Sequence, residues 1–217
     1  LQRNDRSPES VLDLLDSVSG ATSNRHLTGV PSARGIFAAD RNVATAWTSP
    51  FGEAFGSTLT VPLNGTPMTG LDIMQALGGQ HSLITGVQLT DSNGESFDLT
   101  VPAPDADGRS SLAPPQPLTG AQFTLTVTAI DAATTIDRRF GELTTLPVSI
   151  RELVSPAIAL PVRGGHGDDR CDDTLLEIDG QPVGLLLPQA GDTTLVEGQH
   201  VTTCEPLSLA AGTHRIS

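Results

Sequence analysis

The stretch Ala38-Ala39-Asp40-Arg41-Asn42-Val43-Ala44-Thr45-Ala46-Trp47 places acidic, amide and hydroxyl oxygens directly before the one tryptophan of the chain. Asp40, Asn42 and Thr45 follow one another at the spacing of a tight turn. Oxygens of these kinds surround hard cations such as Ca²⁺, which accept carboxylate, hydroxyl and backbone carbonyl ligands together. The stretch therefore predicts a cation-binding loop that leads into a run of strands. The alternative is that Asp40 and Thr45 only cap the turn.

The rest of the composition predicts an all-β protein. Hydrophobic residues make up 37% of the 217 residues, and 22 Gly and 16 Pro divide them into short runs. This pattern is typical of many strands joined by turns and not of a helical bundle. Strands are predicted over 57–63, 70–77, 84–90, 95–101, 122–130 and 146–154. Tight hairpin turns are predicted at 64–65 and 91–94, and a Pro-rich loop over 102–117.

The flanking segments are predicted to differ from this central region. Residues 1–20 predict a short amphipathic helix with Ser7 as its N-cap and Pro8 in the first helical position. After the sandwich expected over 21–162, a Gly- and Asp-rich run opens a second small β unit over 163–217. Its strands are predicted over 174–178, 181–187, 193–196 and 206–209, with an Asp179-Gly180 hairpin turn between the first two.

The two cysteines, Cys171 and Cys204, lie in this second unit. A disulfide between them would close a loop of about 33 residues and stabilise a unit with little core. It would also imply an oxidising, extracytoplasmic location. The alternative is a Zn²⁺ site completed by His166 and His200, although the spacing matches no familiar zinc finger.

Charge and hydropathy exclude several classes of partner. The net charge is −13 and every basic residue is Arg, which argues against nucleic acid and against anionic lipid. No apolar run approaches the ~20 residues that span a bilayer. The chain begins with polar residues and no Met and ends within a strand-like pattern, so we expect a segment of a larger protein. The use of Arg, Ala, Gly and Pro is typical of a high-GC source such as an actinobacterium.

The stretch 38–47 resembles the entry loop of discoidin-like (coagulation factor 5/8 type C, galactose-binding-like) β-sandwiches, written x-Asp-Gly-Asp/Asn-x-x-Thr-x-Trp. The resemblance covers about residues 20–162 and includes 122–130 and 146–153. It implies a jelly-roll sandwich with a structural Ca²⁺, or Na⁺ in its place, and a buried Trp47. The cation ligands that it implies are the Phe37 and Asn42 carbonyls, the Asp40 and Glu152 carboxylates, and the Thr45 hydroxyl and carbonyl. Arg41 stands where the family has Gly, so we expect its backbone to avoid positive φ.

Sugar-binding members of this family use loops at one end of the sandwich. The resemblance therefore makes these loop residues carbohydrate-binding candidates: Gln80, His81, Arg138, Arg139 and Phe140, with Phe51 and Phe55 as further aromatic side chains. A guanidinium beside a ring suits the polar edge and apolar face of a sugar. The alternative is that these are ordinary solvated loops.

Four segments in order, 44–50, 146–153, 176–183 and 209–215, resemble the extracytoplasmic region of actinobacterial α-(1→3)-arabinofuranosyltransferases of the D type. This resemblance implies a non-catalytic region that holds cell-wall arabinan or arabinogalactan near a membrane-embedded active site, with the remaining domains of the parent as partners. No Gly-x-Ser-x-Gly elbow and no Lys-containing phosphate loop is present, so this segment is not expected to be an enzyme. The alternative is a structural or protein-interaction scaffold.

Overall fold

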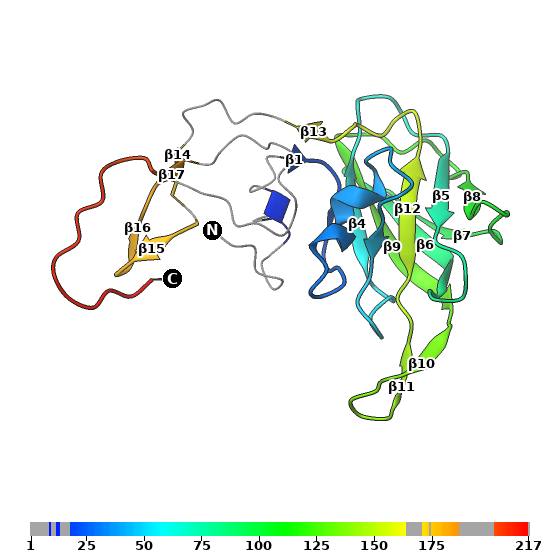
Figure 1. Ribbon diagram of the computed structural model, residues 1–217. Helices are drawn as coiled ribbons and strands as arrows, with labels where there is room; N and C mark the ends of the chain where they lie inside the picture. The colour runs from blue at the N-terminus through cyan, green and yellow to red at the C-terminus, as the bar shows by residue number, and fades with distance from the viewer. Residues whose placement is uncertain are drawn as a thin grey trace. The chain divides into compact units, whose positions relative to one another are not determined.

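The computed structural model describes residues 9, 12–13, 18–163, 171–173, 175–186 and 202–216. The chain divides into two compact units, residues 20–162 and residues 1–19 with 163–217. Strands dominate the described residues (Figure 1), so the predicted all-β class is confirmed. The predicted N-terminal helix falls mostly on residues outside those described and stays a prediction.

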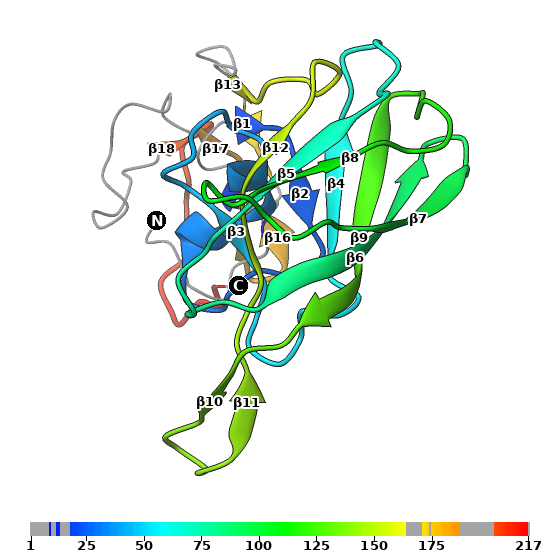
Figure 2. The ribbon, with the colours of Figure 1, turned by 90° about the vertical axis from the view of Figure 1, so that its right-hand side faces the viewer.

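Residues 20–162 form a sandwich of two antiparallel sheets (Figures 1 and 2). One sheet has the strand order β2-β4-β9-β6-β7, and the other has the order β3-β12-β5-β8. The bounds are β2 Thr22–Ser23, β3 Trp47–Thr48, β4 Thr58–Pro62, β5 Leu71–Gln75, β6 Leu83–Asp91, β7 Ser96–Thr100, β8 Arg109–Leu112, β9 Gln122–Asp131 and β12 Ser149–Val154. Two short 3-10 helices, η1 (Pro31–Ala33) and η2 (Gly35–Ala38), precede β3, and β1 (Val18–Ser19) pairs with β13 (Val162–Arg163).

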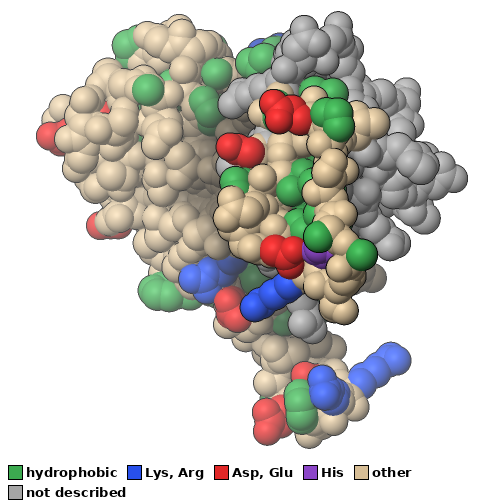
Figure 3. All heavy atoms as spheres, turned by 90° about the vertical axis from the view of Figure 1, so that its left-hand side faces the viewer, with side chains coloured by type: hydrophobic (Ala, Val, Ile, Leu, Met, Phe, Trp, Pro, Cys, Tyr) green, Lys and Arg blue, Asp and Glu red, His purple; other side chains and the backbone are tan. Residues whose placement is uncertain are grey.

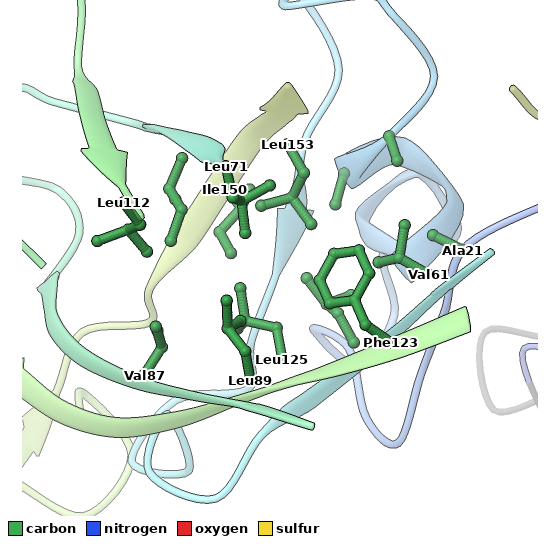
Figure 4. Close-up of a cluster of buried hydrophobic side chains, with 14 of the residues drawn as sticks. Ala21, Val61, Leu71, Val87, Leu89, Leu112, Phe123, Leu125, Ile150 and Leu153 are labelled. Carbon is green, nitrogen blue, oxygen red and sulfur yellow. The ribbon is translucent and has the colours of Figure 1, made fainter. Parts of the chain in front are cut away.

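The core lies between the two sheets and follows from the period-two alternation of the strands. In β9, Phe123, Leu125 and Val127 are fully buried, while the threonines between them face outward. Figure 4 shows side chains of β9 and β6 facing those of β5, β8 and β12 across the interior. Each fully buried side chain of this size contributes about 1.5–3 kcal/mol to folding.

Two predictions about loops are wrong, and the pairing of the strands explains both. Gly65 has a positive φ of 91°, as a turn requires, but β4 and β5 belong to different sheets, so residues 64–65 connect the two sheets and do not close a hairpin. Within the predicted loop 102–117, β8 forms the edge of the four-stranded sheet by pairing with β5. Its sequence Arg-Ser-Ser-Leu carries a single apolar residue, since one of its two buried positions is Ser110, so it shows no apolar alternation.

One hairpin that the sequence did not indicate projects from the sandwich. Strands β10 (Thr134–Ile136) and β11 (Leu143–Thr145) pair with each other only, and they extend beyond the sheets in Figures 1 and 2. Ile136 and Leu143 face each other in register and are both exposed. Because the hairpin buries no face, it has no alternating pattern by which it could be found.

The second unit contains small sheets in its described part. Strands β14 (Cys171–Asp172), β17 (Leu185–Leu186) and β18 (Thr202–Thr203) form one sheet, and β15 (Glu177–Ile178) pairs with β16 (Gln181–Pro182). Asp179 and Gly180 have φ values of 54° and 76°, as the predicted two-residue turn requires. Residues 206–209 are not a strand, so that prediction is wrong, and 193–196 lie outside the described residues.

Cys171 and Cys204 are joined by a disulfide, with their Cα atoms 5.8 Å apart. The bond ties β14 to the residue that follows β18. Gly184 packs directly against the Cys171 sulfur, where any Cβ would collide with it. The alternative zinc site needs His166 and His200, which lie outside the described residues, and sulfurs bonded to each other are not free to be thiolate ligands.

Reduction of this disulfide is expected to lower the free energy of unfolding of the second unit by about 3–4 kcal/mol, because the unfolded chain regains the entropy of an open loop. Thermal unfolding with and without reductant, followed by hydrogen exchange of each unit, measures the effect. The sandwich, which has no cysteine, is the internal control. Equal protection of residues 171–186 in the two redox states would contradict the prediction.

Candidate functional site

The loop between η2 and β3 is held by its own polar side chains. The Asn42 N–H donates to Asp40 Oδ1 at 2.9 Å, and the Ala44 N–H donates to Asn42 Oδ1 at 3.1 Å. Asp and Asn close turns in this way because their short side chains reach the N–H two residues further on. The Thr45 N–H also donates to the Asn42 carbonyl, at 2.9 Å.

Several oxygens converge on the Thr45 hydroxyl within this loop. Thr45 Oγ1 lies 2.9 Å and 3.1 Å from the two Asp40 carboxylate oxygens and 2.6 Å from the Asn42 carbonyl oxygen. A hydroxyl carries one hydrogen, so it can donate to only one of these three acceptors. Close oxygens that share too few hydrogens are the arrangement that a hard cation stabilises.

A β-bulge in β12 brings a second carboxylate to this loop. The pairing of β12 with β5 shifts register between Ile150 and Glu152. Ile150 and Leu153 consequently both face the core, and Glu152 faces the other way, where it is only 4% exposed. The backbone N–H groups of Asn42 and Arg41 hydrogen-bond its carboxylate. Glu152 Oε2 has no hydrogen-bond partner among the described residues.

The electrostatics of Glu152 follow from this burial. Desolvation, followed by repulsion from the Asp40 carboxylate, raises the pKa of Glu152 to about 7, although the N–H groups of Asn42 and Arg41 oppose the shift. Two nearby carboxylates with a buried oxygen left unpartnered form a site of negative charge. A bound cation would remove both the repulsion and the unmet hydrogen-bonding capacity.

The expectation that Arg41 avoids positive φ is wrong: its φ is 60°. The left-handed conformation costs a non-Gly residue about 1–3 kcal/mol. In this conformation the consecutive N–H groups of Arg41 and Asn42 both bond the Glu152 carboxylate. Consecutive N–H groups in such a turn form a concavity that binds anions. The Arg41 side chain is exposed, so the strain affects the backbone alone.

The structure thus brings together four of the five predicted cation ligands, Asp40, Asn42, Thr45 and Glu152, and it places Phe37 in η2 at the entrance of the loop. The part of the chain that is described holds no group of three or more His, Cys, Asp or Glu that suits a metal. The donors here are mostly carbonyl, hydroxyl and carboxylate oxygens, which fit Ca²⁺ or Na⁺ and not Zn²⁺. Trp47 is fully buried, as predicted, and its Nε1 donates to the Arg25 carbonyl at 3.0 Å.

The predicted carbohydrate-binding residues fall into two zones near one end of the sandwich. Gln80 and His81 lie in the loop between β5 and β6, whereas Arg138, Arg139 and Phe140 form the tip of the β10–β11 hairpin. Ser82 fixes the base of the hairpin to the first zone: its hydroxyl accepts from the Ala133 N–H at 3.1 Å and donates to the Leu146 carbonyl at 2.7 Å. Residues 134–137 separate base and tip, a distance of roughly 15 Å along the extended chain.

The first zone contains a pocket of about 220 Å³. It is lined by Ala76, Leu77, Gly78, Gly79, His81, Leu83, Asp131, Ala132 and Ala133. His81 Nδ1 is buried and has no hydrogen-bond partner among the described residues, and burial lowers the pKa of His81 below its usual 6.5. Gln80 is exposed and does not line the pocket. The unpaired nitrogen is covered by protein atoms, so it does not itself face the pocket.

The second zone is an exposed platform. The Arg139 guanidinium carbon lies 5.3 Å from the centre of the Phe140 ring, and 68% of Phe140 is exposed. Figure 3 shows basic, acidic and hydrophobic side chains together on this projecting hairpin. Phe51 and Phe55 are also exposed, and their loop reaches the hairpin because the Gly52 N–H donates to the Thr145 carbonyl at 3.0 Å.

Sequence reasoning missed most of the pocket wall. Leu77 falls within the strand predicted over 70–77, and Leu83 lies just before the strand predicted over 84–90. The segment 131–133 is short and has no pattern. The Gly78-Gly79 pair was the available signal, since both residues have positive φ, 110° and 74°, and a loop without side chains leaves open space.

No family model and no curated protein matches this sequence, but solved structures align with it. The sandwich of two antiparallel sheets agrees with the fold that the resemblance implied. The arabinofuranosyltransferase AftD from Mycobacteria (mutant R1389S, class 1) aligns at 19% identity with a TM-score of 0.56, over 82% of this chain and 15% of the AftD chain. The family 32 carbohydrate-binding module of C. perfringens NanJ, solved with galactose, aligns at 16% identity with a TM-score of 0.44, over 64% of this chain and 93% of that one.

A third structure, the F5/8 type C domain of a Bacteroides fragilis protein, aligns at 14% identity with a TM-score of 0.45, over 65% of this chain and 89% of that one. The likeness of folds rests on the AftD alignment alone. This chain spans only 15% of the length of the AftD chain. Among the described residues, no helix is long and apolar enough to cross a membrane.

Without divalent cations, stability is expected to fall as the pH rises from 4.5 to about 7, the pKa of Glu152 in the folded chain. Over this range the folded state holds a proton that the unfolded state has lost, so deprotonation costs up to about 3 kcal/mol. Thermal melts across this pH range measure the slope. Glu152→Gln should flatten it, whereas Glu142→Gln, an exposed control, should not.

In the same melts at pH 7.5, Ca²⁺ is expected to raise the Tm of the wild-type chain and of Glu142→Gln, because it neutralises the Asp40–Glu152 pair. Glu152→Gln should lose this response. If millimolar Ca²⁺ leaves the Tm of chelator-treated protein unchanged, the loop oxygens bind no Ca²⁺.

Proposed function

We propose that residues 20–162 form a non-catalytic carbohydrate-binding module of a cell-envelope glycosyltransferase, which holds arabinan or arabinogalactan near a membrane-embedded active site. The observation that carries this proposal is the pocket lined in part by His81, Leu77 and Leu83, next to a hairpin with an exposed Arg–Phe pair. A polar group in a partly apolar pocket and an exposed ring are what neutral sugars require.

The distribution of phenylalanine supports a binding role. Of the six Phe in the chain, Phe51, Phe55 and Phe140 are exposed by 49%, 70% and 68%. All three lie in the hairpin or in the loop that hydrogen-bonds to it. Exposing apolar rings to water is unfavourable, so their gathering at one end indicates a contact surface. The fold shared with part of AftD supports the wider assignment to an arabinofuranosyltransferase.

The pocket chemistry favours binding over hydrolysis. Most glycoside hydrolases place two carboxyl groups on either side of the scissile bond. The pocket lining contains one carboxylate, Asp131, and that side chain is exposed. Asp40 and Glu152 do form a pair, but Asp40 is half-buried within the 39–46 loop and Glu152 is buried against that loop, so the two carboxyl groups cannot lie on either side of a glycan bond. Ca²⁺ at this pair would hold the loop and take no part in a reaction.

The disulfide supports an extracytoplasmic location, since such bonds persist in oxidising compartments. The partners proposed are the polysaccharide and the remaining domains of the membrane-embedded parent. Nucleic acid is not among them, because the net charge of −13 opposes it. In a tethered module, a weak sugar contact gains from effective concentration, so high intrinsic affinity is unnecessary.

A second candidate is a protein-interaction scaffold. The specific observation in its favour is the apolar face of the hairpin, where Ile136, Phe140 and Leu143 are exposed by 62%, 68% and 76%. A neighbouring domain of the parent would cover such a face. The scaffold and the module differ in whether free sugars bind.

Arabinan fragments are expected to bind with a Kd of about 0.1–1 mM, because a shallow surface exchanges hydrogen bonds with water and buries few atoms. Ligand-observed NMR measures this range. Arg139→Ala with Phe140→Ala should weaken binding of fragments long enough to reach the hairpin tip, while Glu142→Gln on the same hairpin should not. If no arabinogalactan fragment binds the wild-type chain at several millimolar, the scaffold is the correct function.

A further inference from the structure

One histidine of the second unit has both of its ring nitrogens against acceptor oxygens. His214 Nδ1 lies 2.6 Å from Asp179 Oδ2, and His214 Nε2 lies 2.7 Å from the Ala210 carbonyl oxygen. A backbone carbonyl has no hydrogen to donate, and neither has an ionised carboxylate. Both hydrogen bonds can therefore form together only when each ring nitrogen carries a hydrogen, which makes the ring an imidazolium cation.

The same carboxylate also holds the backbone next to His214. The Arg215 N–H donates to Asp179 Oδ1 at 2.9 Å, and the Asp179 N–H donates to the Arg215 carbonyl at 2.9 Å. The following residue, Ile216, pairs with Ile178 of β15. Asp179 is the first residue of the turn that joins β15 to β16 (Figure 1). The chain around His214 is thus joined to the β15–β16 hairpin through both oxygens of one side chain.

The C-terminal segment, residues 205–216, has no buried apolar side chain to hold it. Each of its side chains except His214 is exposed, including Leu207 and Leu209. Segments with few buried apolar contacts open at a low free-energy cost. The position of this segment on the described part of the unit therefore depends on polar bonds, and the bonds to Asp179 are sensitive to protonation.

Few charged groups surround the His214 ring. The β15–β16 hairpin carries Glu177 and Asp179, and the C-terminal segment carries Glu205 and Arg215. Of these four, Asp179 is the one that forms an ion pair with the ring, among the described residues. The His214 side chain is 22% exposed and the Asp179 side chain is 49% exposed. Water reaches both groups, so a proton can leave the ring directly to solvent.

The electrostatics of the pair agree with its geometry. The hydrogen bond to Asp179, followed by the one to the Ala210 carbonyl, raises the pKa of His214 above its usual 6.5. The hydrogen bond from His214, followed by the one from the Arg215 N–H, lowers the pKa of Asp179 below its usual 3.8. The pair therefore stabilises the folded unit fully between pH 3.8 and 6.5. Its contribution is lost as the pH rises through the raised pKa of His214 or falls through the lowered pKa of Asp179.

We propose that His214 and Asp179 form a proton-operated latch that fixes the C-terminal segment to the β15–β16 hairpin. The latch is closed when both ring nitrogens carry hydrogen. When one proton leaves to solvent, a ring lone pair faces an acceptor oxygen, and the segment separates from the turn. Opening frees the edge of β15 that Ile216 occupies, and a free strand edge can pair with another chain segment. The latch does not depend on whether the sandwich binds a sugar.

The test follows two residues of the whole chain by NMR from about pH 4 to pH 9. The ring signals of His214 report its pKa, which is expected to lie above 6.5. Exchange of the Arg215 amide, corrected for the intrinsic effect of pH, reports opening, and its protection should fall at the same midpoint. The fall should equal ten raised to the difference between the His214 pKa in the protein and in a free peptide of residues 205–217, because one pKa unit is a tenfold change in the linked equilibrium.

Three variants assign the effect to the pair. Asp179→Asn keeps the shape of the side chain and tolerates the positive φ of the turn, but it removes the charge. It should return the pKa of His214 toward 6.5 and remove the step in Arg215 protection. His214→Gln should also remove the step. Glu177→Gln, which neutralises the exposed carboxylate two residues earlier on β15, is the matched control and should keep both the raised pKa and the step.

Three results would overturn the latch. One is a His214 pKa at or below 6.5 in the wild-type chain. Another is a step in Arg215 protection that persists in His214→Gln, because a different group would then cause it. The third is exchange of the Arg215 amide at its intrinsic rate at every pH, because the segment would then not be held at all. Since both readouts lie in the second unit, the pH dependence expected for Glu152 in the sandwich does not enter them.

Discussion

The extra residue in β12 between Ile150 and Glu152 determines how the two faces of the four-stranded sheet are used. With regular pairing, Glu152 would face the core on the same side as Ile150, and Leu153 would face outward. The bulge reverses the alternation, so Ile150 and Leu153 both pack in the core. Glu152 is then buried on the opposite side, against the 39–46 loop. Core packing and the position of the loop thus depend on one irregularity, as is common for bulges near functional sites.

The buried carboxylate in turn explains the unusual features of the loop. Burying a charge is costly unless it is hydrogen-bonded or paired. Arg41 has a left-handed backbone conformation, and the N–H groups of residues 41 and 42 bond Glu152. The side-chain oxygens of Asp40 and Thr45 lie in the same loop. The raised pKa of Glu152, about 7, shows that these bonds do not fully offset the desolvation and the repulsion from Asp40. An oxygen-ligated cation is the group that would balance the remaining charge.

The candidate sugar site has a different requirement, because a ligand has to reach it from solvent. The cation loop is closed over Glu152, whereas the pocket and the hairpin tip lie at the surface. The hairpin has no sheet to support it, so its position depends on the Ser82 hydroxyl and the backbone bonds around it. This anchoring holds a rigid pocket wall and an exposed Arg–Phe platform roughly 15 Å apart along the hairpin. A small pocket with a platform beyond it favours weak, modular recognition, which suits a domain tethered within a larger protein.

The sequence alone determined what local chemistry dictates: the all-β class, most strands of the sandwich, the Asp179-Gly180 turn and a loop rich in oxygen ligands. These follow from period-two alternation and from turn chemistry, which act over a few residues. It did not reveal strand β8, the β10–β11 hairpin, the positive φ of Arg41 or the separation of His81 from Arg139 and Phe140. Those depend on pairing between distant segments. The bulge in β12, the bonds from Ser82 to residues 133 and 146, and the contact of the loop with Glu152 exist only once the sheets have assembled.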